Sequence, residues 1–98
     1  MKRTMVFVPW REGLHLRHAA SLVRVARGFR STICLQCSGR IADMRSVLSI
    51  IALCATMGAG LVVEVTGEDE QDATQAIERV FSPQPDGGAS SGTAQAPR

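Results

Sequence analysis

The stretch Gly13-Leu14-His15-Leu16-Arg17-His18 joins two segments of different pattern, and the fold can be predicted outward from it. Before it, the short apolar run of residues 4–8 is closed by a proline, which is typical of a buried strand. After it, apolar residues recur with helical spacing at Ala19, Leu22, Val23 and Ala26. His15 therefore stands just before a helix, where unpaired backbone N–H groups and the helix dipole favour anions.

The remaining chain continues to alternate short strands with helices. Strands are predicted at 4–8, 32–37, 40–42 and 61–66, and helices at about 17–27, at about 46–55 and after Gly67. Gly28 is expected to stop the first helix in a left-handed conformation. The last helix should carry acids in its first turn (Asp69, Glu70, Asp72) and a core stripe of Ala73, Ala76, Ile77 and Val80. The order β-α-β-β-α-β-α indicates an α+β two-layer sandwich, but the pattern leaves the strand order open.

Length and composition bound the class of protein. Ninety-eight residues allow one domain, and 45% hydrophobic with 20% charged residues suits a globular protein. We expect this domain in residues 1–82 and a disordered Pro/Gly/Ser-rich tail in 83–98. No apolar run is long enough to span a membrane, no signal peptide is visible, and the odd number of cysteines fits a reducing compartment. The sequence thus predicts a cytoplasmic, monomeric protein without membrane insertion.

Charge is distributed unevenly along the chain. Nine of eleven basic residues lie at or before Arg45, whereas seven of nine acids lie at or after Glu64. A face that gathers the early arginines would suit an acidic protein partner or a phosphate. Nucleic acid is not predicted as a partner, because the chain has no tyrosine and few aromatic residues for base stacking.

Two motifs together resemble one known family. Gly13-Leu14-His15-x-Arg17-x-Ala19 resembles the active-site motif of HPr, the histidine phosphocarrier of the bacterial phosphoenolpyruvate:sugar phosphotransferase system. The segment 38–48 is similar to the one that carries this family's regulatory serine, here Ser46. The resemblance runs from about Met5 to Phe81. It implies an antiparallel four-stranded sheet covered on one face by three helices, and a carrier in a phosphoryl relay, without a cofactor, rather than a stand-alone enzyme.

The resemblance also implies roles for individual residues. His15 would accept a phosphoryl group on Nδ1 from enzyme I and pass it to an enzyme IIA component, with Arg17 contacting the phosphate. Ser46 would be phosphorylated by an HPr kinase/phosphorylase, although serine at a helix start is also an ordinary N-cap worth about 1 kcal/mol. As an alternative, the same fold could serve as a regulatory paralogue that signals its phosphorylation state through protein contacts.

The sequence departs from the family at two positions beside His15. The family normally has a small residue at the position of Leu16 and proline at that of His18. Losing proline removes a preset φ from the first helical turn, and we expect His18 to be solvated there, with a role as second phosphoryl acceptor less favoured. A metal site at His15-x-x-His18, even with Cys54, is not predicted, since one histidine pair supplies too few ligands for zinc.

The second predicted helix is apolar almost all round. Only Ser49 is polar between Val47 and Ala55, so a helix on one side of a sheet should leave apolar side chains exposed. An apolar centre ringed by arginines suits brief protein–protein contacts. We define the predicted docking surface as Leu16, Ala20, Arg24, Arg27, Val47, Leu48 and Ile51.

Overall fold

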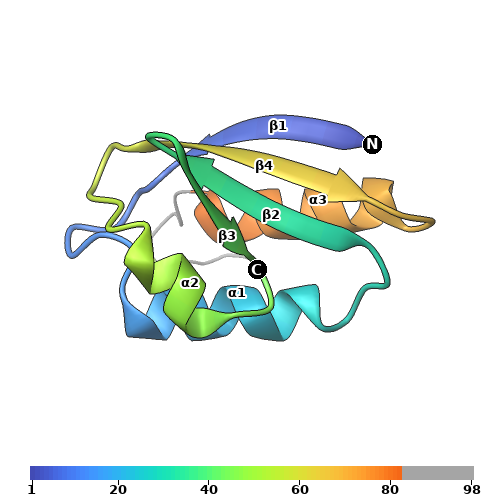
Figure 1. Ribbon diagram of the computed structural model, residues 1–98, viewed down its shortest axis with the longest axis horizontal. Helices are drawn as coiled ribbons and strands as arrows, with labels where there is room; N and C mark the ends of the chain where they lie inside the picture. Colours follow the sequence, from blue (N-terminus) through green and yellow to red (C-terminus); the bar gives the residue numbers. More distant parts are fainter. Residues whose placement is uncertain (83–98) are drawn as a thin grey trace, which may run out of the picture.

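The computed structural model describes residues 1–82, which form one antiparallel sheet and three helices (Figure 1). The predicted element order and fold class are confirmed, and the tail 83–98 lies outside the described residues. The strands are β1 (Lys2–Phe7), β2 (Thr32–Cys37), β3 (Arg40–Asp43) and β4 (Gly60–Thr66), and the helices are α1 (Leu16–Ala26), α2 (Val47–Ala52) and α3 (Glu70–Phe81).

The sheet has the order β1-β4-β2-β3, so the last strand lies between the first two. All neighbours pair antiparallel, and the register places Leu35 opposite Val63. Both side chains are fully buried, as the strand alternation requires of the face turned to the helices. The three helices lie on that face and leave the other open (Figure 1). None of them, in the part of the chain described here, is long and apolar enough to cross a membrane.

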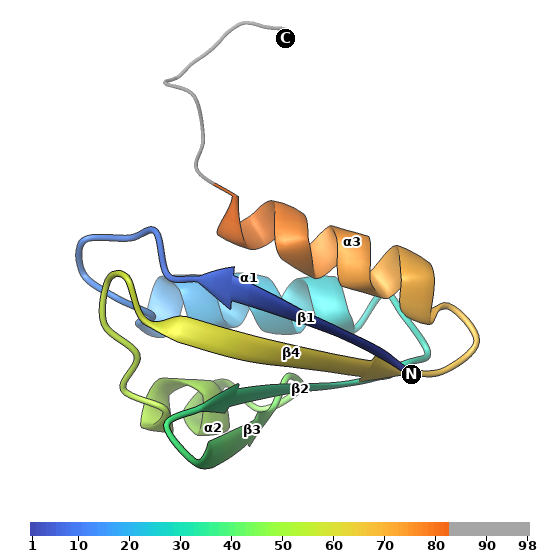
Figure 2. The same ribbon diagram turned by 90° about the horizontal axis from the view of Figure 1, so that it is seen from above.

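The helices complete one core beneath the sheet. Helix α3 packs against β1 and β4, α2 contacts β3, and α1 contacts both other helices (Figure 2). Each contributes at least one completely buried side chain: Leu22, Ile50 and Ile77. Of the stripe predicted for α3, Ala73 and Ile77 are buried, whereas Ala76 and Val80 are only half-buried.

The predicted end of the second helix and the predicted conformation of Gly28 are wrong. Helix α2 ends at Ala52 instead of near Ala55, because the Leu53 and Cys54 amides bond to carbonyls three residues back and Cys54 adopts a positive φ of 54°. Such a tightened turn cannot continue an α-helix. Helix α1 ends with Arg27 as its C-cap, and Gly28 does not have the left-handed φ predicted for it.

Candidate functional site around His15

The loop from β1 to α1 is fixed by backbone contacts with the segment after α2. The Leu14 amide donates a hydrogen bond of 2.9 Å to the Ala55 carbonyl, and the Leu14 side chain is buried. Gly13 has a φ of +79°, and a Cβ there would lie 2.7 Å from the same carbonyl oxygen. Only glycine combines this left-handed conformation with so close an approach of two backbones. The fixed backbone of Gly13 and Leu14 therefore holds the following residue, His15, in a defined position.

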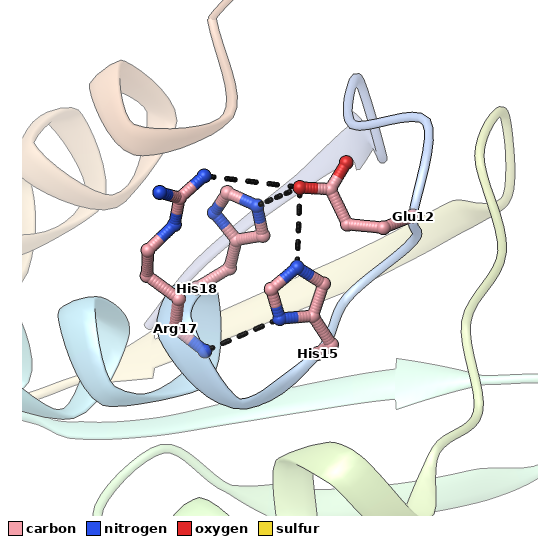
Figure 3. Close-up of polar contacts among 4 residues, drawn as sticks. All are labelled: Glu12, His15, Arg17 and His18. Atoms are coloured by element: carbon pink, nitrogen blue, oxygen red, sulfur yellow. Dashed lines mark hydrogen bonds and ion pairs between the residues drawn. The ribbon is translucent and has the colours of Figure 1, made fainter.

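His15 is the N-cap of α1, and both of its ring nitrogens have partners (Figure 3). Nδ1 accepts a hydrogen bond of 3.3 Å from the Arg17 amide, while Nε2 lies 3.1 Å from Oε2 of Glu12. A neutral imidazole donates through one nitrogen and accepts through the other, so the partners assign the proton to Nε2. The lone pair in the plane of the ring is then on Nδ1, the nitrogen that faces the helix N-terminus and accepts from the Arg17 amide. The side chain is 42% exposed and can be reached from solvent.

Glu12 holds the centre of this group of side chains. Its pKa is lowered from 4.5 to about 2, first by a hydrogen bond from its own backbone amide and then by those from His15 and His18. Oε2 also lies 3.8 Å from the Arg17 guanidinium, whose side chain is 78% exposed. Glu12 is therefore a carboxylate at neutral pH, held opposite the His15 ring.

His18 is not the solvated residue that the sequence predicts. Its side chain is only 12% exposed, and its ring stacks on Trp10 with centroids 3.7 Å apart and planes 7° apart. Trp10 in turn packs against Phe81 at the end of α3. Burial lowers the pKa of His18 below its ordinary value of 6.5, although the nearby Glu12 carboxylate opposes the shift. At neutral pH the ring is uncharged, and its Nε2 lies 3.4 Å from Oε2 of Glu12.

We call Trp10, Glu12, His15 and His18 the loop cluster. The sequence analysis placed His15 and His18 in this region but missed Glu12 and Trp10. Strand and helix periodicities say nothing about which side chains meet in an irregular loop. The available signal was the gathering of one carboxylate and two imidazoles within seven consecutive residues, Glu12 to His18.

The predicted docking residues of α1 lie mostly on its surface. Leu16 is 63% exposed, and Arg24 and Arg27 are exposed, whereas Ala20 is half-buried. Leu16 thus places an apolar side chain in solvent immediately after His15. Arg24 lies about two turns and the C-cap residue Arg27 about three turns farther along the same helix.

Helix α2 divides its apolar residues between core and surface. Ile50 is fully buried, Val47 and Ile51 are half-buried, and Leu48 is 79% exposed. Ser46 caps the helix, with its hydroxyl accepting a 3.2 Å hydrogen bond from the Ser49 amide. The N-cap interpretation of Ser46 is therefore confirmed, while its regulatory interpretation stays a prediction.

Fold and site together define the class of small open-sandwich proteins that present a histidine at the start of a helix. Residues 2–82 match the family model described as the PTS HPr component phosphorylation site. The phosphocarrier protein HPr of Xylella fastidiosa is 36% identical over 69 residues, which cover 70% of this chain and 78% of that protein. The chain therefore belongs to the HPr family, the phosphocarriers of the phosphotransferase system.

Solved structures of the family share the fold. An HPr from Thermoanaerobacter tengcongensis is similar with a TM-score of 0.79 and 27% identity, covering 83% of this chain and 91% of that one. Crh, the catabolite repression HPr of Bacillus subtilis, is similar with a TM-score of 0.65 and 30% identity, covering 82% and 93%. The resemblance noted in the sequence is thereby confirmed at the level of the family and its fold.

Proposed function

We propose that His15 accepts a phosphoryl group on Nδ1 from enzyme I and passes it to an enzyme IIA component. The observation that carries this proposal is the pair of contacts on the ring, with Glu12 at Nε2 and the Arg17 amide at Nδ1. The Nδ1 lone pair attacks the phosphorus of the donor, the N–P bond forms and the bond to the donor breaks. Because Nε2 keeps its proton, the ring gains positive charge, which the Glu12 carboxylate opposite it stabilises.

The start of α1 supplies groups for the phosphoryl oxygens. The Arg17 amide already points at Nδ1, and the first amides of a helix have no partners within it. The Arg17 guanidinium is mostly exposed, and its contact with Glu12 is long, at 3.8 Å, so the guanidinium is free to turn toward a phosphoryl group. Oriented amides at a helix start and a guanidinium are both suited to this dianion.

Docking of the partners is assigned to the predicted docking surface. Leu16 and Leu48 offer exposed apolar side chains, and the exposed Arg24 and Arg27 provide positive charge farther along α1. Apolar contacts with a charged rim are typical of transient complexes, in which charge speeds the encounter.

A regulatory role at Ser46 is the second candidate function. The similarity to Crh, whose name refers to catabolite repression, supports it, as does the position of Ser46 two residues before the exposed Leu48. A phosphate added there by an HPr kinase/phosphorylase would place negative charge beside the apolar part of the docking surface. An acidic partner would then be repelled.

The test is to incubate the chain with enzyme I and phosphoenolpyruvate and to map the product by mass spectrometry. We expect an acid-labile phosphoryl group on His15, its loss in His15→Ala, and unchanged labelling in Cys54→Ser, which alters an exposed side chain outside the proposed machinery. Labelling of His18 instead, or no labelling, would refute the assignment.

A further inference from the structure

Three potential metal ligands converge in the loop cluster. Oε2 of Glu12 lies 3.1 Å from Nε2 of His15 and 3.4 Å from Nε2 of His18, and one ligand atom from each residue lies within 4.8 Å of the others (Figure 3). Zinc binds such atoms at about 2.0–2.2 Å, so neighbouring ligands of a tetrahedral ion are roughly 3.3–3.5 Å apart. The two distances to Glu12 are already close to that spacing.

We propose that Glu12, His15 and His18 form a binding site for a divalent transition-metal ion, with Zn²⁺ as the best match. Two imidazoles and one carboxylate are a known three-ligand set for zinc with a fourth position open. Imidazole donors disfavour Mg²⁺ and Ca²⁺, which prefer oxygen ligands. The sequence analysis predicted no metal because it counted only the two histidines, whereas the folded loop brings a third ligand to them.

The surroundings both support and oppose the ion. Stacking on Trp10 holds the His18 ring, and the N-cap position holds His15, so little side-chain freedom is lost on binding. The Arg17 guanidinium, which lies 3.8 Å from the same Glu12 oxygen, would repel a bound cation. It must move away, which its 78% exposure allows.

Metal binding has a consequence for the proton on His15. Coordination uses the lone pair of Nε2, so that nitrogen gives its proton to solvent and the neutral ring takes one up on Nδ1. Nδ1–H can no longer accept from the Arg17 amide, and it has no lone pair with which to attack phosphorus. The metal-bound and phosphoryl-accepting forms of His15 therefore exclude each other. This regulatory part rests on the proposed function, whereas the binding site itself does not.

Binding is tested on the full chain by Zn²⁺ titration against a competing chelator. We expect one ion per chain, with affinity at least about tenfold lower in Glu12→Gln and in His18→Ala. Glu68→Gln removes an exposed carboxylate elsewhere, and Cys54→Ser removes an exposed thiol; both should bind as wild type. Binding that is absent, or lost in Cys54→Ser and kept in Glu12→Gln, would overturn the site.

The proton switch is tested separately by ¹⁵N NMR of the imidazoles and by phosphorylation. Zn²⁺ should move the His15 proton from Nε2 to Nδ1 and suppress labelling by enzyme I. Each protein is compared with its own metal-free rate in the same mixture, and Zn²⁺ should slow labelling of His18→Ala less than labelling of wild type. A direct effect of Zn²⁺ on enzyme I would slow both equally. Site-specific binding without suppression would overturn the switch alone. Failure of labelling in metal-free chain would refute the proposed function and leave the binding result standing.

Discussion

Replacing Gly13 by alanine tests whether the backbone contact beneath His15 determines both stability and transfer. Gly13 has a φ of +79°, and the new Cβ would lie 2.7 Å from the Ala55 carbonyl oxygen. Left-handed backbone costs a residue with a side chain roughly 1–2 kcal/mol. Relieving the clash must also lengthen the hydrogen bond from the Leu14 amide to that oxygen, at a cost of about 0.5–1.5 kcal/mol. Gly13→Ala should therefore lose about 1.5–3.5 kcal/mol of stability.

Gly39 provides a matched control for this substitution. Its φ of +81° is nearly the same, but a Cβ there would meet nothing within 4 Å. Gly39→Ala should therefore lose only the roughly 1–2 kcal/mol of backbone strain. The contribution of the close approach at Gly13 is the difference between the two variants.

Urea unfolding, followed by the fluorescence of Trp10 and by far-UV circular dichroism, measures the loss of stability. Trp10 is the only tryptophan, and it stacks on His18 in the loop cluster. Thermal midpoints should fall by about 4–8 °C per kcal/mol in a domain of this size. Phosphorylation of His15 should also slow, by up to roughly 10²-fold for a shift of about 1 Å. Equal stability of Gly13→Ala and Gly39→Ala, with unchanged phosphorylation, would refute the reasoning.

Two further predictions concern the docking surface and the start of α3. Leu48→Lys should lower kcat/KM for phosphoryl transfer while changing stability by less than about 0.5 kcal/mol. The control Ile41→Lys, which alters an exposed side chain on the open face of the sheet, should leave kcat/KM unchanged. Equal kcat/KM values for the two variants would contradict the docking surface. Asp69 accepts hydrogen bonds from the Ser31 hydroxyl and from the amides of Arg30 and Ser31, which lower its pKa below 3.8. Because the folded-state pKa is depressed, this stabilisation exists above pH 3.8 and is lost on further acidification. Wild type should thus lose its advantage over Asp69→Asn in denaturant midpoints at low pH, and a pH-independent advantage would argue against it.

Periodicity was enough to predict the order of strands and helices, because it reports which face of each element is buried. It also placed His15 at the start of α1, since the helical stripe from Ala19 to Ala26 begins just after it. The antiparallel sheet was expected from the resemblance to HPr, and its strand order came from the structure, because alternation within a strand carries no information about its neighbours.

The contacts that build the site could not be predicted from local pattern. Glu12 and Trp10 belong to a loop without periodicity, and their contacts with His15 and His18 arise because Gly13 and Leu14 are fixed against the Ala55 backbone. The same packing buries His18, which a helical pattern alone places in solvent. Local pattern predicts whether each segment forms a strand or a helix. The position of the proton on His15 and the orientation of its ring depend instead on side-chain contacts that exist only in the folded loop.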